Sequence, residues 1–268
     1  MPPKNQARRF ERHIGIDYSG AKTSDDPLPG LRVFVALGDD AASEVRSPGR
    51  RSGHWTRREL AHWLRDELMH GQPTCVGIDH GLSVPLDYWQ AHGLSGSWAA
   101  FLHDFNTHWD SRPPGLSVDD LRLSALHPAR QRQGSARWRR RCEQACRAKS
   151  VFHFGCPGSV AKSTHAGLPW VAWLKAELGE RLLVWPMEGW MPRAGAHMLF
   201  EAYPSFYADQ VAVRSFGCRD QFDAYAVATW LATQDRAGRL GDWLAPPADP
   251  ATARVAEQEG WILGVPWP

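Results

Sequence analysis

The chain has 268 residues, 43% of them hydrophobic and 22% charged, and its formal net charge is +2, which is ordinary for a globular protein with a sizeable core. No stretch approaches the roughly 18 to 20 uninterrupted apolar residues of a membrane span, and segment 1–12 lacks the apolar middle of a signal peptide. Five cysteines, a low and odd number, argue against a disulfide framework, so we expect a cytoplasmic protein without a membrane span.

The chain opens with a predicted antiparallel meander of three short strands. The first apolar run ends in the tripeptide Gly15-Ile16-Asp17, and a turn follows it. Residues Leu31–Leu37 form the second predicted strand, and a hairpin turn leads from it to a short edge strand at Ala42–Arg46. This meander leads the chain away from the first aspartate.

A helical crossover then returns the chain to the sheet. Residues Trp55–Met69 carry apolar side chains at helical spacing, with Thr56 placed as the N-cap and Gly71 beyond the end. The strand Thr74–Asp79 follows, and it contains a second copy of the tripeptide, Gly77-Ile78-Asp79. Because a helix precedes this strand, we expect it to run parallel to the first.

The rest of the chain continues with helices and strands around one irregular insertion. The segment 110–150 is rich in Pro and Arg and is predicted to cover the core as a flap, and residues 236–268 are predicted to pack as a Pro- and Trp-rich C-terminal strap. Val151–Phe154 is predicted to be briefly extended. Further helices are predicted at Ser83–His92, Trp98–Trp109, Ala166–Leu178 and Arg219–Gln234, and further strands at Leu182–Trp185 and Met198–Tyr203. These elements predict an α/β fold with a mixed central sheet flanked by helices.

The two strand-terminal aspartates are the strongest chemical signal. Asp17 and Asp79 each follow a buried run, where a carboxylate is poorly placed for stability, and the ends of parallel strands are where α/β proteins place their sites. If the two strands are neighbours, the carboxylates converge and repel each other unless a proton or a cation lies between them. A divalent-metal site is therefore the leading hypothesis.

The predicted helix that begins near Arg219 adds two acids on one face. Asp220 and Asp223 are three residues apart, and their face continues through Val227 and Trp230, among alanines that permit close approach to a sheet. Asp220 alone could be an N-cap. Asp223 lies inside the helix, so capping does not explain it.

Glu201 is a further candidate ligand, because it interrupts an otherwise apolar strand that Pro204 ends. On its own it could be an edge-strand glutamate that faces water. The presence of the other acids favours a place beside them.

The order of these motifs resembles an uncharacterised domain family whose members are predicted RNase H-like nucleases. The motifs are Asp17, Asp79, Glu-x-Tyr-Pro at 201–204 and Asp-x-x-Asp-Ala at 220–224, and the last helix is also similar to that of Holliday-junction resolvases of the same superfamily. The resemblance covers roughly residues 14–230, including segments 149–152 and 163–170. It implies an RNase H-like domain over 13–235. It also implies a site in which Asp17, Asp79, Glu201 and Asp223 hold two Mg²⁺ or Mn²⁺ ions, with Asp220 as an auxiliary ligand or cap.

Two competing motifs receive less support. Segment 158–163 precedes a helix as a phosphate loop would, but both P-loop glycines are missing, which leaves only a looser contact of Lys162, Ser163 and Thr164 with a substrate phosphate. Zinc is the second alternative, but the ligand spacing is unusual, and buried or incidental cysteines are the favoured explanation. Its ligands by type would be Cys142, Cys146, His153 and Cys156.

The flap concentrates positive charge. From His127 to Lys149 there are eight Lys or Arg residues against one acid. Such a run is often a solvated face, but beside a carboxylate site it favours contact with a nucleic-acid backbone, and we expect Arg139, Arg140 and Arg141 to supply that contact.

Together these features predict metal-dependent hydrolysis of phosphodiester bonds in a nucleic acid. A catalytically silent RNase H-like module that binds nucleic acid or protein is the alternative. A phosphotransferase of the actin-like ATPase kind is disfavoured, because the sequence has no second glycine-rich phosphate turn.

Overall fold

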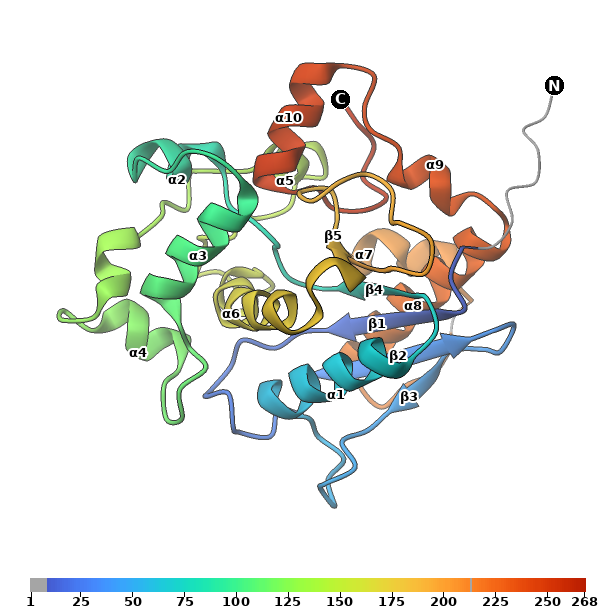
Figure 1. Ribbon diagram of the computed structural model, residues 1–268. Coiled ribbons are helices and arrows are strands. Elements are labelled where there is room, and N and C mark those ends of the chain that lie inside the picture. The colour runs from blue at the N-terminus through green and yellow to red at the C-terminus, as the bar shows by residue number, and fades with distance from the viewer. Residues whose placement is uncertain (1–8, 213) are drawn as a thin grey trace.

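The computed structural model describes residues 9–212 and 214–268, so most of the basic segment 1–12 lies outside the described residues. A six-stranded sheet in the order β3-β2-β1-β4-β6-β5 forms the centre, with helices on both faces (Figure 1). The strands are β1 (Arg12–Asp17), β2 (Arg32–Leu37), β3 (Ser43–Val45), β4 (Thr74–Ile78), β5 (Leu182–Val184) and β6 (His197–Glu201).

The strand directions confirm the predicted mixed sheet. Strands β1, β2 and β3 form an antiparallel meander, whereas β4 is parallel to β1, and β6 and β5 continue the parallel half. The predicted α/β fold, antiparallel first and parallel after, with helices on both sides, is therefore confirmed.

Helix α1 (Arg57–His70) makes the crossover between the two halves of the sheet. Thr56 is its N-cap and forms a capping box with Glu59, and Gly71 is the C-cap residue, as the sequence predicts. The crossover brings the chain back beside β1 and sets β4 parallel to it.

Nine further helices complete the described part of the chain. Figure 1 places α1 and α6 in front of the sheet and α8 behind it. The helices are α2 (Leu86–Ala91), α3 (Trp98–Trp109), α4 (Val118–Leu123), α5 (Arg141–Ala145), α6 (Ala161–Leu178), α7 (Pro204–Tyr207), α8 (Arg219–Arg236), α9 (Leu240–Leu244) and α10 (Pro250–Glu259), and short 3-10 turns lie at Pro128–Arg132, Gly179–Arg181 and Ala208–Gln210.

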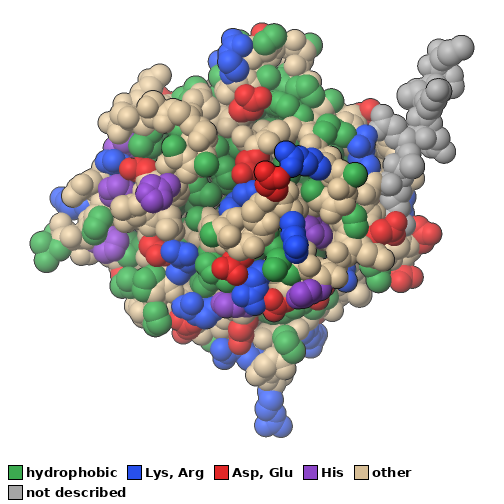
Figure 2. All heavy atoms as spheres, in the orientation of Figure 1, with side chains coloured by type: hydrophobic (Ala, Val, Ile, Leu, Met, Phe, Trp, Pro, Cys, Tyr) green, Lys and Arg blue, Asp and Glu red, His purple; other side chains and the backbone are tan. Residues whose placement is uncertain are grey.

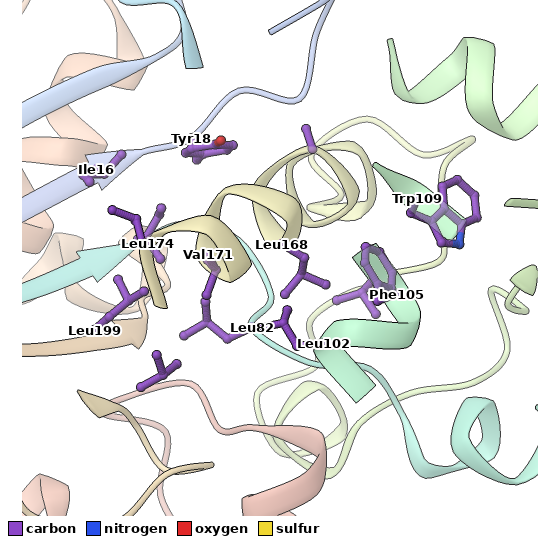
Figure 3. Close-up of a cluster of buried hydrophobic side chains, with 14 of the residues drawn as sticks. Ile16, Tyr18, Leu82, Leu102, Phe105, Trp109, Leu168, Val171, Leu174 and Leu199 are labelled. Carbon is purple, nitrogen blue, oxygen red and sulfur yellow. The ribbon is translucent and has the colours of Figure 1, made fainter. Parts of the chain in front are cut away.

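The main hydrophobic core lies between the sheet and helix α6. Val171 and Leu174 of α6 lie close to Ile16 of β1 and Leu199 of β6, and Leu102 of α3 belongs to the same core (Figure 3). Helix α6 is buried along most of its length, which explains why its apolar residues do not follow a single stripe.

Two glycines allow helix α8 to lie directly on the other face of the sheet. Gly15 of β1 and Gly77 of β4 are partners in the parallel ladder. A Cβ at Gly15 would lie 2.2 Å from the backbone oxygen of Ala224, and one at Gly77 would lie 2.6 Å from Cγ1 of Val227. Because real Cβ atoms do not approach so closely, this packing requires glycine at both positions.

The structure differs from the sequence-based expectation at the start of α6 and just before it. Helix α6 begins at Ala161, five residues before the predicted start at Ala166. Residues 151–154 form turns and not an extended piece, because their backbone N–H groups find local partners. Val151 N donates to a carboxylate oxygen of Glu143 at 3.1 Å, and His153 N donates to the carbonyl of Ser150 at 2.9 Å.

The C-terminal segment packs against the end of β6. After α9 and α10, residues 261–265 are buried, and Leu263 N donates to the carbonyl of Glu201 at 3.0 Å. Within the described ranges, no helix has the length and apolar character needed to cross a membrane.

Replacing Gly15 with Ala is expected to push α8 away from the sheet. We expect the free energy of unfolding to fall by about 3 kcal/mol, the upper end of the usual cost of overpacking, because the added Cβ meets backbone atoms. Urea denaturation measures this change. Gly155→Ala is the matched control, since nothing lies within 4 Å of a Cβ at that position, and it should change stability by less than about 0.5 kcal/mol. Equal stability of both variants would contradict the packing argument.

Candidate active site

The alternation of side chains along β1 and β4 places the two strand-terminal aspartates on the α8 side of the sheet. Gly15 and Gly77 face α8, so the side chains two residues later, Asp17 and Asp79, project from the same face. The backbone N–H of Asp79 donates to the carbonyl of Ile16 at 2.9 Å, which fixes the end of β4 beside β1. The predicted convergence of these two residues at one sheet edge follows from this pairing.

Helix α8 brings Asp220 and Asp223 to the same edge. Asp220 is in the first turn but is not the N-cap, which is Cys218, so the predicted capping role of Asp220 is wrong. A Cβ at Gly30 would lie 3.3 Å from Oδ2 of Asp220, which places this carboxylate over the loop that leads into β2. We call Asp17, Asp79, Asp220 and Asp223 the aspartate cluster.

Burial and mutual repulsion raise the pKa values of the strand-terminal pair. Burial, followed by the charges of Asp79, Asp220 and Asp223, raises the pKa of Asp17 to about 9, against a smaller opposing effect of Arg219. Burial, followed by the charge of Asp223 and a smaller contribution from Glu201, raises the pKa of Asp79 to about 8. At neutral pH both groups therefore hold a proton unless a cation replaces it.

Arg219 is a cation at the exposed edge of the aspartate cluster. Nε of Arg219 lies 2.8 Å from Oδ1 and 2.9 Å from Oδ2 of Asp223, and it donates a hydrogen bond to Oδ2. Burial raises the pKa of Asp223, and this arginine opposes the rise. Asp17 and Asp79 have no hydrogen bond or ion pair from their side chains to any residue that the structure describes. The sequence signal that could have identified Arg219 is its position four residues before Asp223.

The carboxylates share an edge but are not assembled around an ion. Among the described residues, no group of three His, Cys, Asp or Glu side chains is arranged to hold a metal, and this includes the alternative zinc set around Cys142. The donor chemistry of the aspartate cluster nevertheless fits a hard divalent cation, because all four donors are carboxylates.

Glu201 lies beside Asp79, as the sequence favours, but it is paired with a cation and is not open as a fourth ligand of the aspartate cluster. Its partner in the β4–β6 ladder is Ile78, so its side chain points away from α8, although Glu201 and Asp79 line one pocket at the end of the sheet. Both of its oxygens bind Arg140, with Nη1 at 2.6 Å and Nη2 at 2.7 Å. A carboxylate held by a buried guanidinium is not free to bind an ion beside Asp17.

The arginines expected to contact nucleic acid have mostly structural roles. Arg140 is fully buried between Glu201 and Glu143, and Arg139 donates to the carbonyls of Glu143 and Ala148. Arg141 alone among the three has an exposed side chain. On the face in Figure 2, basic side chains are interspersed with acidic and apolar ones. The expectation of direct phosphate contact is therefore wrong for Arg140, which forms buried ion pairs with Glu143 and Glu201.

The first turn of α6 positions the loops after both aspartates. Gly20 packs against the backbone of Lys162, where an added Cβ would lie 2.2 Å from its carbonyl, and Gly81 N donates to Oγ1 of Thr164 at 2.9 Å. Ser163 and Thr164 are buried, which removes them from the predicted contact with a substrate phosphate. Lys162 is partly exposed and paired with Asp119.

A pocket that sequence reasoning missed opens beside Asp79. It has a volume of about 160 Å³, and its wall includes the exposed side chains of Arg147 and Lys149. No local pattern marks it, because its lining comes from β4, the flap, β6 and the C-terminal strap.

Comparison of the chain with protein-family models, curated proteins and solved structures finds no match. The resemblance to RNase H-like nucleases therefore stays a prediction based on the residues, and the geometry of the site has to support the function by itself.

The raised pKa values should make the metal-free protein less stable as pH rises. An unfolded aspartate has a pKa of about 3.9, whereas Asp17 and Asp79 in the folded protein have values of about 9 and about 8. Between these values the folded state binds more protons than the unfolded state, so the free energy of unfolding decreases with pH, by at most about 1.4 kcal/mol per pH unit for each proton.

Urea denaturation in EDTA between about pH 5 and about pH 8 measures this slope. Asp17→Asn is expected to reduce it, because that side chain no longer titrates. Asp209→Asn, which changes an exposed aspartate, should keep the wild-type slope. Equal slopes in the wild type and Asp17→Asn would show that the carboxylate is not perturbed.

Replacing Glu201 with Gln is expected to destabilise the protein, because Arg140 then keeps only one of its two buried carboxylates. Breaking a buried ion pair costs about 3 to 5 kcal/mol, and the lower end applies because Glu143 remains. Asp79→Asn, which removes an unpaired carboxyl from the same sheet edge, should not destabilise. Thermal and urea unfolding of the two variants test this contrast, and an undiminished stability of Glu201→Gln would refute the assigned pairing.

Proposed function

We propose that the protein is a divalent-metal-dependent phosphodiesterase that acts on nucleic acid. The observation that carries the proposal is the convergence of Asp17 and Asp79 at one sheet edge, partly buried and without a side-chain hydrogen bond or ion pair to any described residue. Asp223 adds a third carboxylate from α8. Carboxylates placed together in this way destabilise the folded chain, and a role in ligand binding explains why the protein has them.

The ligand that fits this arrangement best is Mg²⁺ or Mn²⁺. Both ions prefer carboxylate oxygens, and either would replace the protons that Asp17 and Asp79 otherwise hold. Asp17, Asp79 and Asp223 would hold the metal, and Asp220 would be auxiliary. When bound, such ions activate water and neutralise charge on a transferring phosphate. Glu201 is outside this set because Arg140 already binds it.

The chain's own residues contribute position and charge. The pairing of β1 with β4 holds Asp17 and Asp79 side by side, and α8 fixes Asp223 above them. The guanidinium of Arg219, largely exposed beside Asp223, is placed to bind a substrate phosphate through charge-assisted hydrogen bonds. All five cysteines are free, which supports the cytoplasm as the place of this activity.

One observation favours the second candidate, a catalytically silent module that binds nucleic acid or protein. The described carboxylates do not form a group of three placed to hold an ion. The two candidates differ in a measurable way, because only the first requires metal-dependent cleavage.

Added Mn²⁺ or Mg²⁺ is expected to raise the midpoint of thermal unfolding. An ion that binds only the folded state stabilises it by RT ln(1 + [L]/Kd), about 2.7 kcal/mol at a hundredfold excess over Kd. Asp17→Asn and Asp79→Asn should lose this response, whereas Asp209→Asn should keep it. A flat midpoint up to millimolar Mn²⁺ would refute the metal site.

The same proteins should be incubated with Mn²⁺ and labelled single-stranded, duplex and branched nucleic acids. We expect the wild type to cleave at least one of them and Asp17→Asn to cleave none. Stabilisation by Mn²⁺ without any cleavage would leave a metal-binding module and would overturn the enzymatic proposal.

A further inference from the structure

The pocket beside Asp79 is closed at its inner end, and we call it the blind pocket. Its floor and inner wall consist of buried residues from the flap, β6 and the C-terminal strap, each no more than 3% exposed. Those residues are Arg140, Glu143, Glu201, Ala202 and Ile262. Its mouth is lined by partly or fully exposed residues, and Asp79 forms the wall that it shares with the aspartate cluster.

The floor presents no free anionic acceptor to the pocket. Both oxygens of Glu201 accept from Arg140, and Oε2 also accepts from the backbone N–H of Leu82 at 3.4 Å. The carboxylate of Glu143 accepts from Arg140 and from Val151 N. The floor carboxylates are therefore satisfied by the protein, and they do not compete for the cations at the mouth.

The uncommitted charges at the mouth are positive. Arg147 is exposed, and its side chain has no hydrogen bond or ion pair to any described residue. Lys149 donates to the carbonyl of Pro157 at 2.6 Å, which leaves two of its three ammonium donors available. Two cations that face a pocket beside the aspartate cluster are suited to an anionic group.

The backbone at Arg147 supports a functional reason for this side chain. Arg147 follows the C-cap of α5 and has a φ of 58°, in the left-handed region where glycine is preferred. A non-glycine residue there is strained, and such strain is concentrated at functional sites. The chain keeps a free guanidinium at the mouth in spite of that strain.

The size of the pocket limits its occupant to one chemical group. Sites for drug-sized ligands have volumes of about 300 to 1,000 Å³, whereas the blind pocket has about 160 Å³. Because the residues at its inner end are buried, the end of a strand can place its last group inside the pocket, whereas a continuous strand can only lie across the mouth.

We infer that the blind pocket binds the terminal phosphate of a nucleic-acid strand through Arg147 and Lys149. The strand would then lie with its last nucleotides across Asp79, which directs cleavage to the neighbourhood of an end. This inference rests on the proposed function, because the aspartate cluster supplies the reaction for which the pocket selects the substrate.

Fluorescence anisotropy with Ca²⁺ as the divalent ion tests the inference on one oligonucleotide sequence carrying a 5′-phosphate, a 3′-phosphate or only hydroxyl ends. We expect one of the phosphorylated ends to bind at least tenfold more tightly than the hydroxyl ends. Arg147→Gly and Lys149→Gln should each reduce that preference to threefold or less. Arg137→Gln, an exposed arginine of the flap that does not line the pocket, is the matched control and should retain it.

Arg147→Gly also separates a binding role from a structural one, because glycine relieves the left-handed backbone. We expect its thermal midpoint to equal or exceed that of the wild type while the end preference falls. Inorganic phosphate that abolishes the preference at micromolar concentration would identify a site for the free anion and overturn the assignment to a strand end.

The outcomes for the pocket and for the enzyme are distinguishable. Equal binding of hydroxyl and phosphate ends overturns the inference, and the enzymatic proposal survives if Mn²⁺-dependent cleavage continues without end preference, including cleavage of circular single strands. An end preference that depends on Arg147, in a protein that cleaves nothing, would retain the pocket and remove the proposed function.

Discussion

The contact of α8 with Gly15 and Gly77 is the constraint on which the candidate site depends. It sets the distance between helix and sheet, because the backbone of α8 lies against Gly15 and the side chain of Val227 lies against Gly77. The period of two along a strand then directs Asp17 and Asp79 to the helix side, just beyond the contact. The two ends of each Gly-Ile-Asp tripeptide thus have linked roles. The glycine allows α8 to pack closely on the sheet, and the aspartate lies near the first turn of α8.

The structure satisfies buried carboxylates in two different ways at this end of the sheet. Glu201 is neutralised permanently by Arg140, a fully buried residue whose guanidinium is held by protein groups alone. Asp17 and Asp79 have no such ion pair among the described residues, and their raised pKa values mean that they hold protons at neutral pH. A permanent ion pair stabilises the fold. A carboxyl group that holds a proton can exchange it for a cation, and it is therefore suited to binding.

Local signals predicted the fold well, and long-range pairing limited the prediction of the site. The crossover helix could be predicted from Thr56 and its capping pattern, and the parallel pairing followed from the connection. The aspartates could be predicted because their tripeptide occurs twice. The pairing of Glu201 could not be predicted, because it depends on the register of β6 against β4, which places Glu201 opposite Ile78. Its cation, Arg140, lies 61 residues earlier in an irregular segment that gives no periodic signal.

The charge of the Arg-rich flap is therefore divided between two functions, and this division explains its composition. Arg139 and Arg140 bind carbonyls and carboxylates that the irregular backbone would otherwise leave unsatisfied under the flap. A flap with little regular structure needs such donors to pack at all. Arg147 and Lys149 lie at the mouth of the blind pocket, where neither side chain is paired with a described carboxylate. The number of Lys and Arg residues in the sequence therefore overstates the positive charge that a ligand can reach. The burial of each side chain shows which of these charges are accessible.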